Sequence, residues 1–210
     1  MEENRQKGKF IVFEGTDGSG KSTQMKLLSK YLAGRGLSCV LTREPTDSPI
    51  GAMLRSCLSG RIDTDERAIA ALFAADRLDH ILNPVDGIKT KLNGGITVLC
   101  DRYYLSSFAY NGEFVDSAWV EELNRPAREE LRPDLVVYLD LTPEEGMKRV
   151  ARRGECDRYE TLERQERIRN RYFDCFRRFA DENVAIIQSE VDKMQTQAHI
   201  RAVVNRLFGW

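Results

Sequence analysis

The segment Phe10–Thr23 limits the possible folds of this chain more than any other, and it reads FIVFEGTDGSGKST. Residues 15–22 match the full G-x-x-x-x-G-K-[ST] pattern of a phosphate-binding loop. An apolar run containing the β-branched residues Ile11 and Val12 precedes the loop, and an amphipathic pattern follows it. The order of strand, loop and helix that this loop requires is therefore present, and it predicts an α/β fold of the P-loop NTPase class.

Each residue type in the loop has a physical reason. The glycines allow backbone N–H groups to approach phosphate oxygens closely, and the positive end of the following helix points at the same place. The lysine suits the β- and γ-phosphates, and the hydroxyl of Ser22 suits Mg2+. The residues expected to bind the nucleotide phosphates are Gly15, Thr16, Asp17, Gly18, Ser19, Gly20, Lys21, Ser22 and Thr23.

The rest of the chain alternates between apolar strand patterns and amphipathic helix patterns. Further strands are expected over residues 38–42, 96–100, 135–140 and 184–188. Helices are expected over residues 50–58, 65–82, 117–131, 143–152, 161–181 and 193–207, with a helix start at Pro84, a turn or short helix at 104–111 and a break at Pro126. This order predicts a three-layer sandwich, with a five-stranded parallel sheet covered by helices on both faces. We expect residues 1–210 to form a single domain.

Composition sets limits on the partners. The 210 residues carry a formal net charge of -1, so the whole-chain charge gives no reason to expect a nucleic-acid partner. No apolar run reaches the roughly 20 residues of a membrane span, and the polar N-terminus does not resemble a secretory signal. The 5 cysteines form no C-x-x-C pair, and we expect reduced thiols in a cytoplasmic protein.

Charged residues gather at two further places. Asp101 follows the predicted strand 96–100, where a carboxylate can hold Mg2+ directly or through water. Residues 149–160 form a basic stretch between two predicted helices, which suits a mobile lid that brings arginines to the transferred phosphate. The later arginines of helix 161–181 fit a solvated face, with i,i+4 pairs such as Glu163–Arg167 and Asp174–Arg178.

Other enzyme and binding classes share the phosphate-binding loop. GTPase switches carry an N-K-x-D segment, and this chain contains none. A DNA-associated or structural ATPase would need a further recognition domain, for which 210 residues leave little room. A kinase acting on a small acceptor is therefore favoured. On pattern alone, Phe73 is a core residue and Asp76–Arg77 a weak surface ion pair.

A series of motifs resembles the thymidylate kinase family, in the family's order and over nearly the whole chain. The motifs are F-E-G-x-D-G-x-G-K-[ST]-T-Q (13–24), T-R-E-P (42–45) with Arg55 beyond it, L-F-A-A-D-R (72–77), D-R-Y-x-x-S-S-x-A-Y (101–110), R-P-D-L (132–135) and D-R-Y-E (157–160). The resemblance implies transfer of the ATP γ-phosphoryl group to dTMP, with Mg2+ as cofactor. It also implies a homodimer.

The resemblance assigns roles residue by residue. Phe73 would stack on thymine, Arg77 would bond the base edge, Tyr110 would pack under the sugar, and Arg102 would grip the acceptor phosphate. The full set implied for dTMP is Asp17, Arg43, Pro45, Arg55, Phe73, Arg77, Arg102, Ser106, Ser107, Tyr110, Asn111 and Tyr159. The set implied for catalysis is Asp17, Lys21, Arg102, Arg153 and Arg158, and the set for Mg2+ is Ser22 and Asp101.

Two positions distinguish this chain within the family. Some members carry the catalytic arginine inside the phosphate-binding loop, where this chain has Gly18, so the bacterial-type arrangement with Arg153 or Arg158 in the lid is expected. Many bacterial members have glutamine where this chain has Asn111, which predicts a weaker or water-bridged base contact. The alternative function is a P-loop kinase for another nucleoside monophosphate or for a deoxynucleoside, in which Glu44 would be the candidate base.

Overall fold

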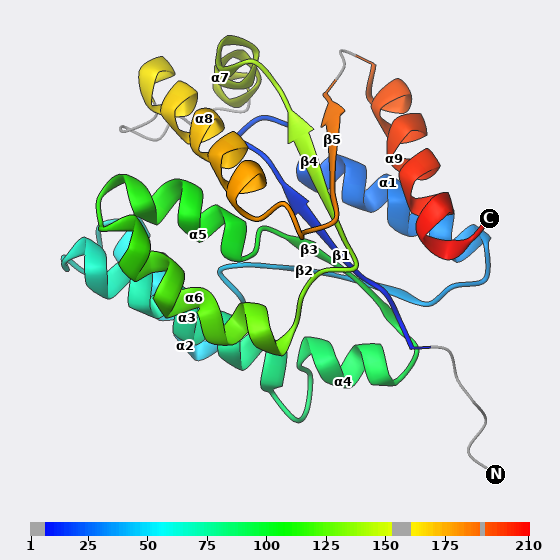
Figure 1. The fold of residues 1–210 in the computed structure, drawn as a ribbon, viewed down its shortest axis with the longest axis horizontal. Coiled ribbons are helices and arrows are strands. Elements are labelled where there is room, and N and C mark those ends of the chain that lie inside the picture. Colours follow the sequence, from blue (N-terminus) through cyan, green and yellow to red (C-terminus); the bar gives the residue numbers. More distant parts are fainter. Residues whose placement is uncertain (1–6, 153–160, 190–191) are drawn as a thin grey trace.

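The computed structural model describes residues 7–152, 161–189 and 192–210 (Figure 1). Its sheet contains five strands in the order β2-β3-β1-β4-β5, and every neighbouring pair is parallel. The strands are β1 (Phe10–Glu14), β2 (Cys39–Arg43), β3 (Thr97–Asp101), β4 (Leu135–Asp140) and β5 (Val184–Gln188). The predicted sheet is confirmed, and the strand that carries the phosphate-binding loop lies at its centre.

Helices connect the strands and cover both faces of the sheet. Those before β3 are α1 (Lys21–Gly34), α2 (Pro49–Leu58), α3 (Glu66–Leu82) and α4 (Ile88–Asn93). Those between β3 and β4 are α5 (Tyr104–Tyr110), the 3-10 turn η1 (Asn111–Glu113) and α6 (Ser117–Glu130). The last are α7 (Pro143–Ala151), α8 (Leu162–Arg178) and α9 (Lys193–Phe208). None of these helices is both long enough and apolar enough to cross a membrane.

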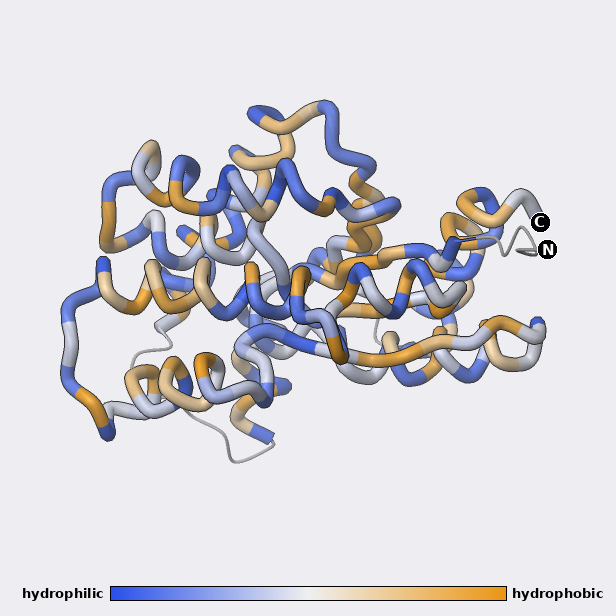
Figure 2. The backbone as a smooth tube through the Cα atoms, turned by 90° about the horizontal axis from the view of Figure 1, so that it is seen from below, coloured by the Kyte–Doolittle hydropathy of each residue, from blue (hydrophilic) through white to orange (hydrophobic). Residues whose placement is uncertain are grey.

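Alternate residues of the strands enter two different cores. Phe10 and Val12 of β1 pack with residues of α3, α4, α5, α6 and α8. Ile11 and Phe13 pack with residues of α1 and α9 on the opposite face, and Figure 1 shows these two helices together on one side of the sheet. Figure 2 shows hydrophobic stretches through the middle of the molecule, whereas the helices alternate between hydrophobic and hydrophilic residues. The central strands β1, β3 and β4 are largely apolar because both of their faces are buried, whereas the edge strands β2 and β5 are partly exposed.

Two predictions based on proline are wrong. Pro126 lies inside a continuous α6, because Val120 and Ala127, both buried, anchor the helix before and after it. Pro84 begins no helix; the chain turns after Asn83, whose side-chain oxygen accepts from the N–H of Val85 at 3.0 Å. At Pro126, packing therefore keeps the helix intact despite the proline. At Pro84, the proline lies in a turn and does not start a helix.

Candidate active site

The phosphate-binding loop joins the carboxyl end of β1 to the first residue of α1. Gly15, Gly18 and Gly20 have φ angles of 144°, 79° and 94°, which side chains with a Cβ rarely adopt. A Cβ added to Gly18 would lie 2.4 Å from the carbonyl oxygen of Gly146 in α7. The loop and α7 therefore touch backbone to backbone, and this contact requires glycine at position 18.

The amino group of Lys21 lies over the loop. Its Nζ donates to the carbonyl oxygens of Gly15 at 2.9 Å and Thr16 at 3.1 Å, and the side chain is buried. Burial lowers the pKa of Lys21, and the nearby charge of Arg102 lowers it further. An anion bound in the loop would compensate both effects, so the site is suited to phosphate.

Ser22 and Asp101 form an oxygen pair at the end of β3. The Ser22 hydroxyl donates to Asp101 Oδ2 at 3.1 Å, while Asp101 Oδ1 is buried with no hydrogen-bond partner in the described part of the chain. Both residues line an open cavity together with Arg43 and Asp47. A buried carboxylate oxygen without a partner, beside a hydroxyl, fits a hard divalent cation such as Mg2+.

Arg102 brings several predicted residues together. It has a left-handed backbone, with φ of 70°. Its Nη2 donates to Asp17 Oδ1 at 2.5 Å and to the Tyr110 hydroxyl at 3.2 Å, and its Nη1 donates to Ser106 Oγ at 3.3 Å. The guanidinium also lies 4.7 Å from the centre of the Tyr110 ring. Asp17, Arg102, Ser106 and Tyr110 therefore form one cluster beside the phosphate-binding loop.

Glu14, at the end of β1, holds this cluster in place, and the sequence reasoning missed it. Its buried carboxylate accepts from the N–H of Tyr103 at 2.9 Å, from Ser106 Oγ at 2.6 Å and from the Tyr172 hydroxyl at 2.8 Å. Burial raises the pKa of Glu14, and this effect is larger than the lowering caused by these hydrogen bonds and by the charge of Arg102. An acidic residue ending a strand that is otherwise wholly apolar was the available signal.

The loop after β2 carries another group of predicted residues. Arg43 is exposed and pairs with Asp47 at 2.8 Å. Arg55 of α2 donates to the carbonyl oxygens of Pro45, at 3.3 Å, and of Thr46. Arg43, Pro45 and Arg55 are therefore close together. Arg43 also lines the same cavity as Ser22 and Asp101, so this group lies next to the phosphate-binding loop.

The interpretation of Asp76–Arg77 as a surface ion pair is wrong, because both side chains are buried and they bind different partners. Asp76 accepts from the N–H of Thr46 at 2.8 Å and from its hydroxyl at 2.5 Å. Arg77 pairs with Glu44 at 2.7 Å and donates to Ser107 Oγ at 3.0 Å and to Asn124 Oδ1. The two adjacent residues thus fix two different parts of the site.

The remaining acceptor-side residues lie on α3 and η1. Phe73 is half-buried and packs against a cluster formed by Leu54, Cys57 and Ile69. Asn111 is buried at the start of η1, directly after Tyr110. Part of the Phe73 ring is therefore in the core, as its pattern suggested, and part remains available to a ligand.

Of the predicted lid, residues 149–152 are described. Arg149 of α7 donates to Glu145 at 3.1 Å and to Ser189 Oγ at 3.1 Å, and that hydroxyl in turn donates to the carbonyl oxygen of Ser19 at 2.8 Å. Two hydrogen bonds therefore connect Arg149 to the phosphate-binding loop. Arg153, Arg158 and Tyr159 lie outside the described residues.

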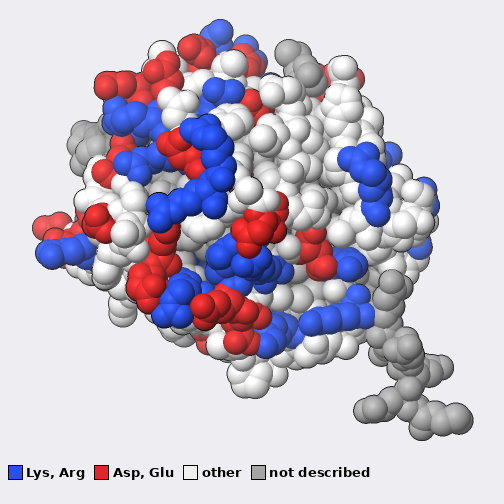
Figure 3. Space-filling model, in the orientation of Figure 1, with Lys and Arg blue, Asp and Glu red and all other residues white. Residues whose placement is uncertain are grey.

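The arginines of α8 form more than a solvated face. The predicted pair Glu163–Arg167 is present at 3.0 Å, but Arg178 pairs with Glu121 of α6 at 2.7 Å instead of with Asp174. Arg169 binds Asp140 at the end of β4 with N–O distances of 2.6 and 2.8 Å. Figure 3 shows basic and acidic side chains intermixed on this face of the molecule. Most of these arginines therefore fasten α8 to neighbouring elements.

Comparison with known proteins agrees with this geometry. The family model described as thymidylate kinase matches residues 13–200. A "Probable thymidylate kinase" of Thermococcus kodakarensis is 37% identical, over 95% of this chain and 98% of the relative. A "Thymidylate kinase" of Caldicellulosiruptor saccharolyticus is 42% identical, over 74% of this chain and 75% of the relative. A "Thymidylate kinase" of Desulfotalea psychrophila is 38% identical, over 77% and 78%.

Proposed function

The chain belongs to the thymidylate kinase family, and we infer from this that it phosphorylates dTMP to dTDP with ATP as the phosphoryl donor. The single observation that best supports this reaction is the position of Arg102. It lies between the phosphate-binding loop and the acceptor-side residues, bonded to Asp17 and Tyr110. The Arg102 guanidinium is thereby placed between the loop that binds the ATP phosphates and the side where the acceptor phosphate of dTMP would bind.

The proposed mechanism is in-line transfer, in which positioning and electrostatics supply nearly all of the catalysis. The loop N–H groups and Lys21 neutralise the transferred phosphate, while Arg102 orients the acceptor phosphate. No general base is needed, because the dTMP phosphate is already anionic. A Mg2+ ion held by Ser22 and Asp101, directly or through water, would supply further charge stabilisation.

For the acceptor, we propose the residues that the family resemblance assigns. Phe73 stacks on the base, Arg77 bonds its edge, and Tyr110 lies under the sugar. The complete proposed set is Asp17, Arg43, Pro45, Arg55, Phe73, Arg77, Arg102, Ser106, Ser107, Tyr110, Asn111 and Tyr159. On the donor side, residues 149–160 are proposed as a lid with Arg153 or Arg158 as the catalytic arginine, which the bonding of Arg149 toward the phosphate-binding loop supports.

A deoxynucleoside kinase is disfavoured by the state of Glu44. Such an enzyme needs a free carboxylate to accept the proton of the 5′-hydroxyl. Both oxygens of Glu44 are occupied, one by Arg77 at 2.8 Å and the other by His80 at 3.1 Å, and the side chain is buried. The Glu44 carboxylate therefore binds the Arg77 guanidinium and is not placed to act as a base.

The test is ADP release from ATP and Mg2+ with dTMP, dUMP, UMP, AMP, GMP and thymidine offered in parallel. Strong preference for dTMP is expected. Turnover with thymidine would support the alternative function of a deoxynucleoside kinase. ATP hydrolysis at the same rate with and without each acceptor would contradict phosphoryl transfer.

Replacing Asp101 with asparagine is expected to raise the Mg2+ concentration needed for half-maximal activity by about tenfold or more, because the proposed ligand pair loses its charge. The measurement is a Mg2+ titration at saturating ATP and dTMP. Asp63→Asn, which changes an exposed carboxylate in the loop before α3, is the matched control. An unchanged Mg2+ requirement in Asp101→Asn would remove Asp101 from the cation site.

We also propose a cytoplasmic homodimer. Exposed apolar side chains lie on α2, on the loop after it, at the end of α3 and in the turn that follows α3. They are Met53, Leu58, Ile62, Leu82 and Val85. Contact with a second copy would remove these apolar side chains from water. Sedimentation equilibrium that gives the mass of a single chain at micromolar concentration would contradict the dimer.

A further inference from the structure

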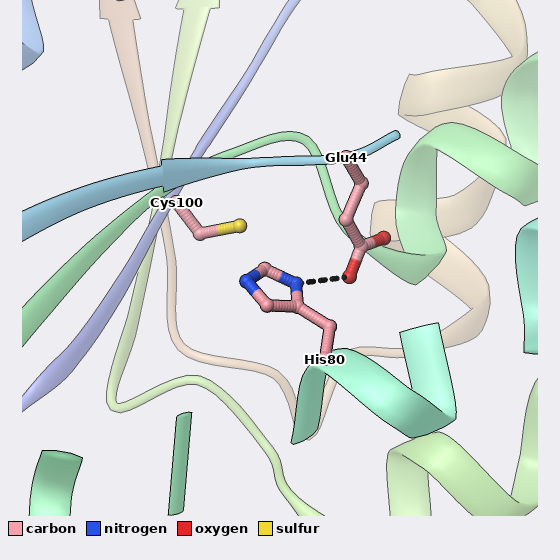
Figure 4. A group of neighbouring side chains, drawn as sticks. All are labelled: Glu44, His80 and Cys100. Carbon is pink, nitrogen blue, oxygen red and sulfur yellow. Dashed lines mark hydrogen bonds and ion pairs between the residues drawn. The ribbon is translucent and has the colours of Figure 1, made fainter. Parts of the chain in front are cut away.

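A buried cluster of Glu44, His80 and Cys100 lies behind the acceptor side. One ligand-type atom from each of these side chains lies within 4.8 Å of the other two. Figure 4 shows the imidazole between the thiol and the carboxylate, with one ring nitrogen directed at Glu44. The residue types suit a transition metal, so the cluster is either a metal site or a hydrogen-bonded network.

The hydrogen bonds favour a network. His80 Nδ1 lies 3.1 Å from Glu44 Oε1, and His80 Nε2 lies 2.7 Å from Thr42 Oγ1. The Cys100 thiol donates to the carbonyl oxygen of Arg102 at 3.2 Å. Each atom that would bind a metal therefore already has a partner within the protein.

The partners also assign the tautomer of His80. Glu44 is paired with Arg77 at 2.7 Å, so its carboxylate accepts hydrogen bonds. In the neutral imidazole, Nδ1 of His80 then carries the proton and donates to Oε1, while Nε2 accepts from the Thr42 hydroxyl. The result is a directed chain of donors that runs from Thr42 through His80 to Glu44.

This chain fixes the orientation of Arg77. Its Nε and Nη2 both point at Glu44 Oε2, at 2.8 and 2.7 Å, and its Nη1 donates to Ser107 and Asn124. A guanidinium has five N–H donors. The printed hydrogen bonds use the N–H of Nε and the two of Nη1, while Nη2 forms an ion pair with Glu44. Within the described part of the chain, Nη2 donates no further hydrogen bond, and the direction of its N–H groups depends on where the Glu44 carboxylate lies.

We propose that His80 is a positioning residue for base selectivity, acting through Glu44 to direct an Nη2 N–H of Arg77 at the acceptor base. The inference rests on the proposed function, in which Arg77 bonds the base edge. Because arginine only donates, the oriented N–H recognises a base with an oxygen acceptor at position 4 and rejects one with an amino group there. Without His80, no described residue bonds the second oxygen of the Glu44 carboxylate, and the guanidinium turns with the carboxylate.

The experiment compares dTMP with 5-methyl-dCMP, which keeps the 5-methyl group but has a 4-amino group and no proton on N3. In His80→Leu, we expect KM for dTMP to rise about tenfold, the effect of one well-oriented hydrogen bond to a charged group. We expect kcat for dTMP to stay within about twofold, and KM for 5-methyl-dCMP to change little, because Arg102 and the phosphate-binding loop are untouched. Discrimination between the two bases therefore falls about tenfold.

Two further variants separate positioning from a general loss of structure. His80→Gln retains an amide donor toward Glu44 and an acceptor toward Thr42, so it is expected to recover most of the selectivity. Thr42→Val removes only the far hydrogen bond, so it is expected to shift KM in the same direction as His80→Leu but by less, and it keeps the proposal testable if His80→Leu does not fold. His199→Leu, which changes the exposed histidine of α9, is the matched control.

Several outcomes would overturn the proposal. These are equal losses with both substrates, a fall in kcat without a change in KM, and a His80→Gln variant as impaired as His80→Leu. One equivalent of zinc in the purified protein would also do so, since the metal would replace the hydrogen bonds described. If the wild-type protein does not phosphorylate dTMP, the proposed function fails, and that result is separate from any comparison among variants.

Discussion

Replacing Lys21 with alanine is expected to lower kcat/KM for dTMP phosphorylation by about 10² to 10³, the usual effect of deleting a stabiliser of transition-state charge. The Lys21 amino group lies at the mouth of the loop, within 2.9 Å of the Gly15 carbonyl oxygen, and no other lysine of α1 is buried. The loop N–H groups remain in the variant, so binding of ATP should weaken less than turnover does.

The control for this variant is Lys30→Ala, which removes an exposed lysine from the same helix. The Lys21 charge is desolvated in the folded protein, as its lowered pKa indicates, so Lys21→Ala should retain a melting temperature close to that of the wild type. A folded Lys21→Ala variant with near wild-type turnover would remove Lys21 from the catalytic site.

Replacing Arg102 is expected to have an effect of similar size on catalysis, and two variants distinguish its side chain from its backbone. Arg102→Ala and Arg102→Gly both remove the guanidinium that bonds Asp17 and Tyr110, so both should lose about 10² or more in kcat/KM. The alanine variant must still adopt a φ of 70°. It should therefore be about 1 kcal/mol less stable toward unfolding than the glycine variant.

Steady-state kinetics and urea unfolding of the two variants measure these effects separately. If the alanine variant is the more stable of the two, the left-handed conformation at position 102 carries no strain for a residue with a Cβ. If either variant retains wild-type kcat/KM, the acceptor phosphate is held by other groups, and Arg43 and Arg55 are the candidates to test next.

The sheet could be predicted because each of its strands is a short apolar run between helix patterns. The strand order could not be read in the same way, since it depends on how the crossovers pack and not on any single segment. The helix around Pro126 likewise depends on packing that no single segment of the sequence shows. The proline ring removes a helix hydrogen bond wherever it stands, but only the folded structure shows that Val120 and Ala127 are buried around it.

In the candidate site, the predicted residues that the structure brings together belong to contiguous motifs, and the errors concern partners distant in sequence. Asp76 and Arg77 were interpreted as a pair because they are neighbours. Their actual partners are Thr46, Glu44 and Asn124, which lie 30, 33 and 47 residues away. Charge in a sequence shows that a partner is required but not which residue provides it.

The contact between Gly18 and Gly146 restricts how this enzyme can evolve. With a Cβ at position 18 placed 2.4 Å from the Gly146 carbonyl oxygen, no side chain enters the loop unless α7 first moves away. A side chain at position 18 therefore requires a second change that moves α7. We therefore expect positions 18 and 146 to covary among relatives of this chain.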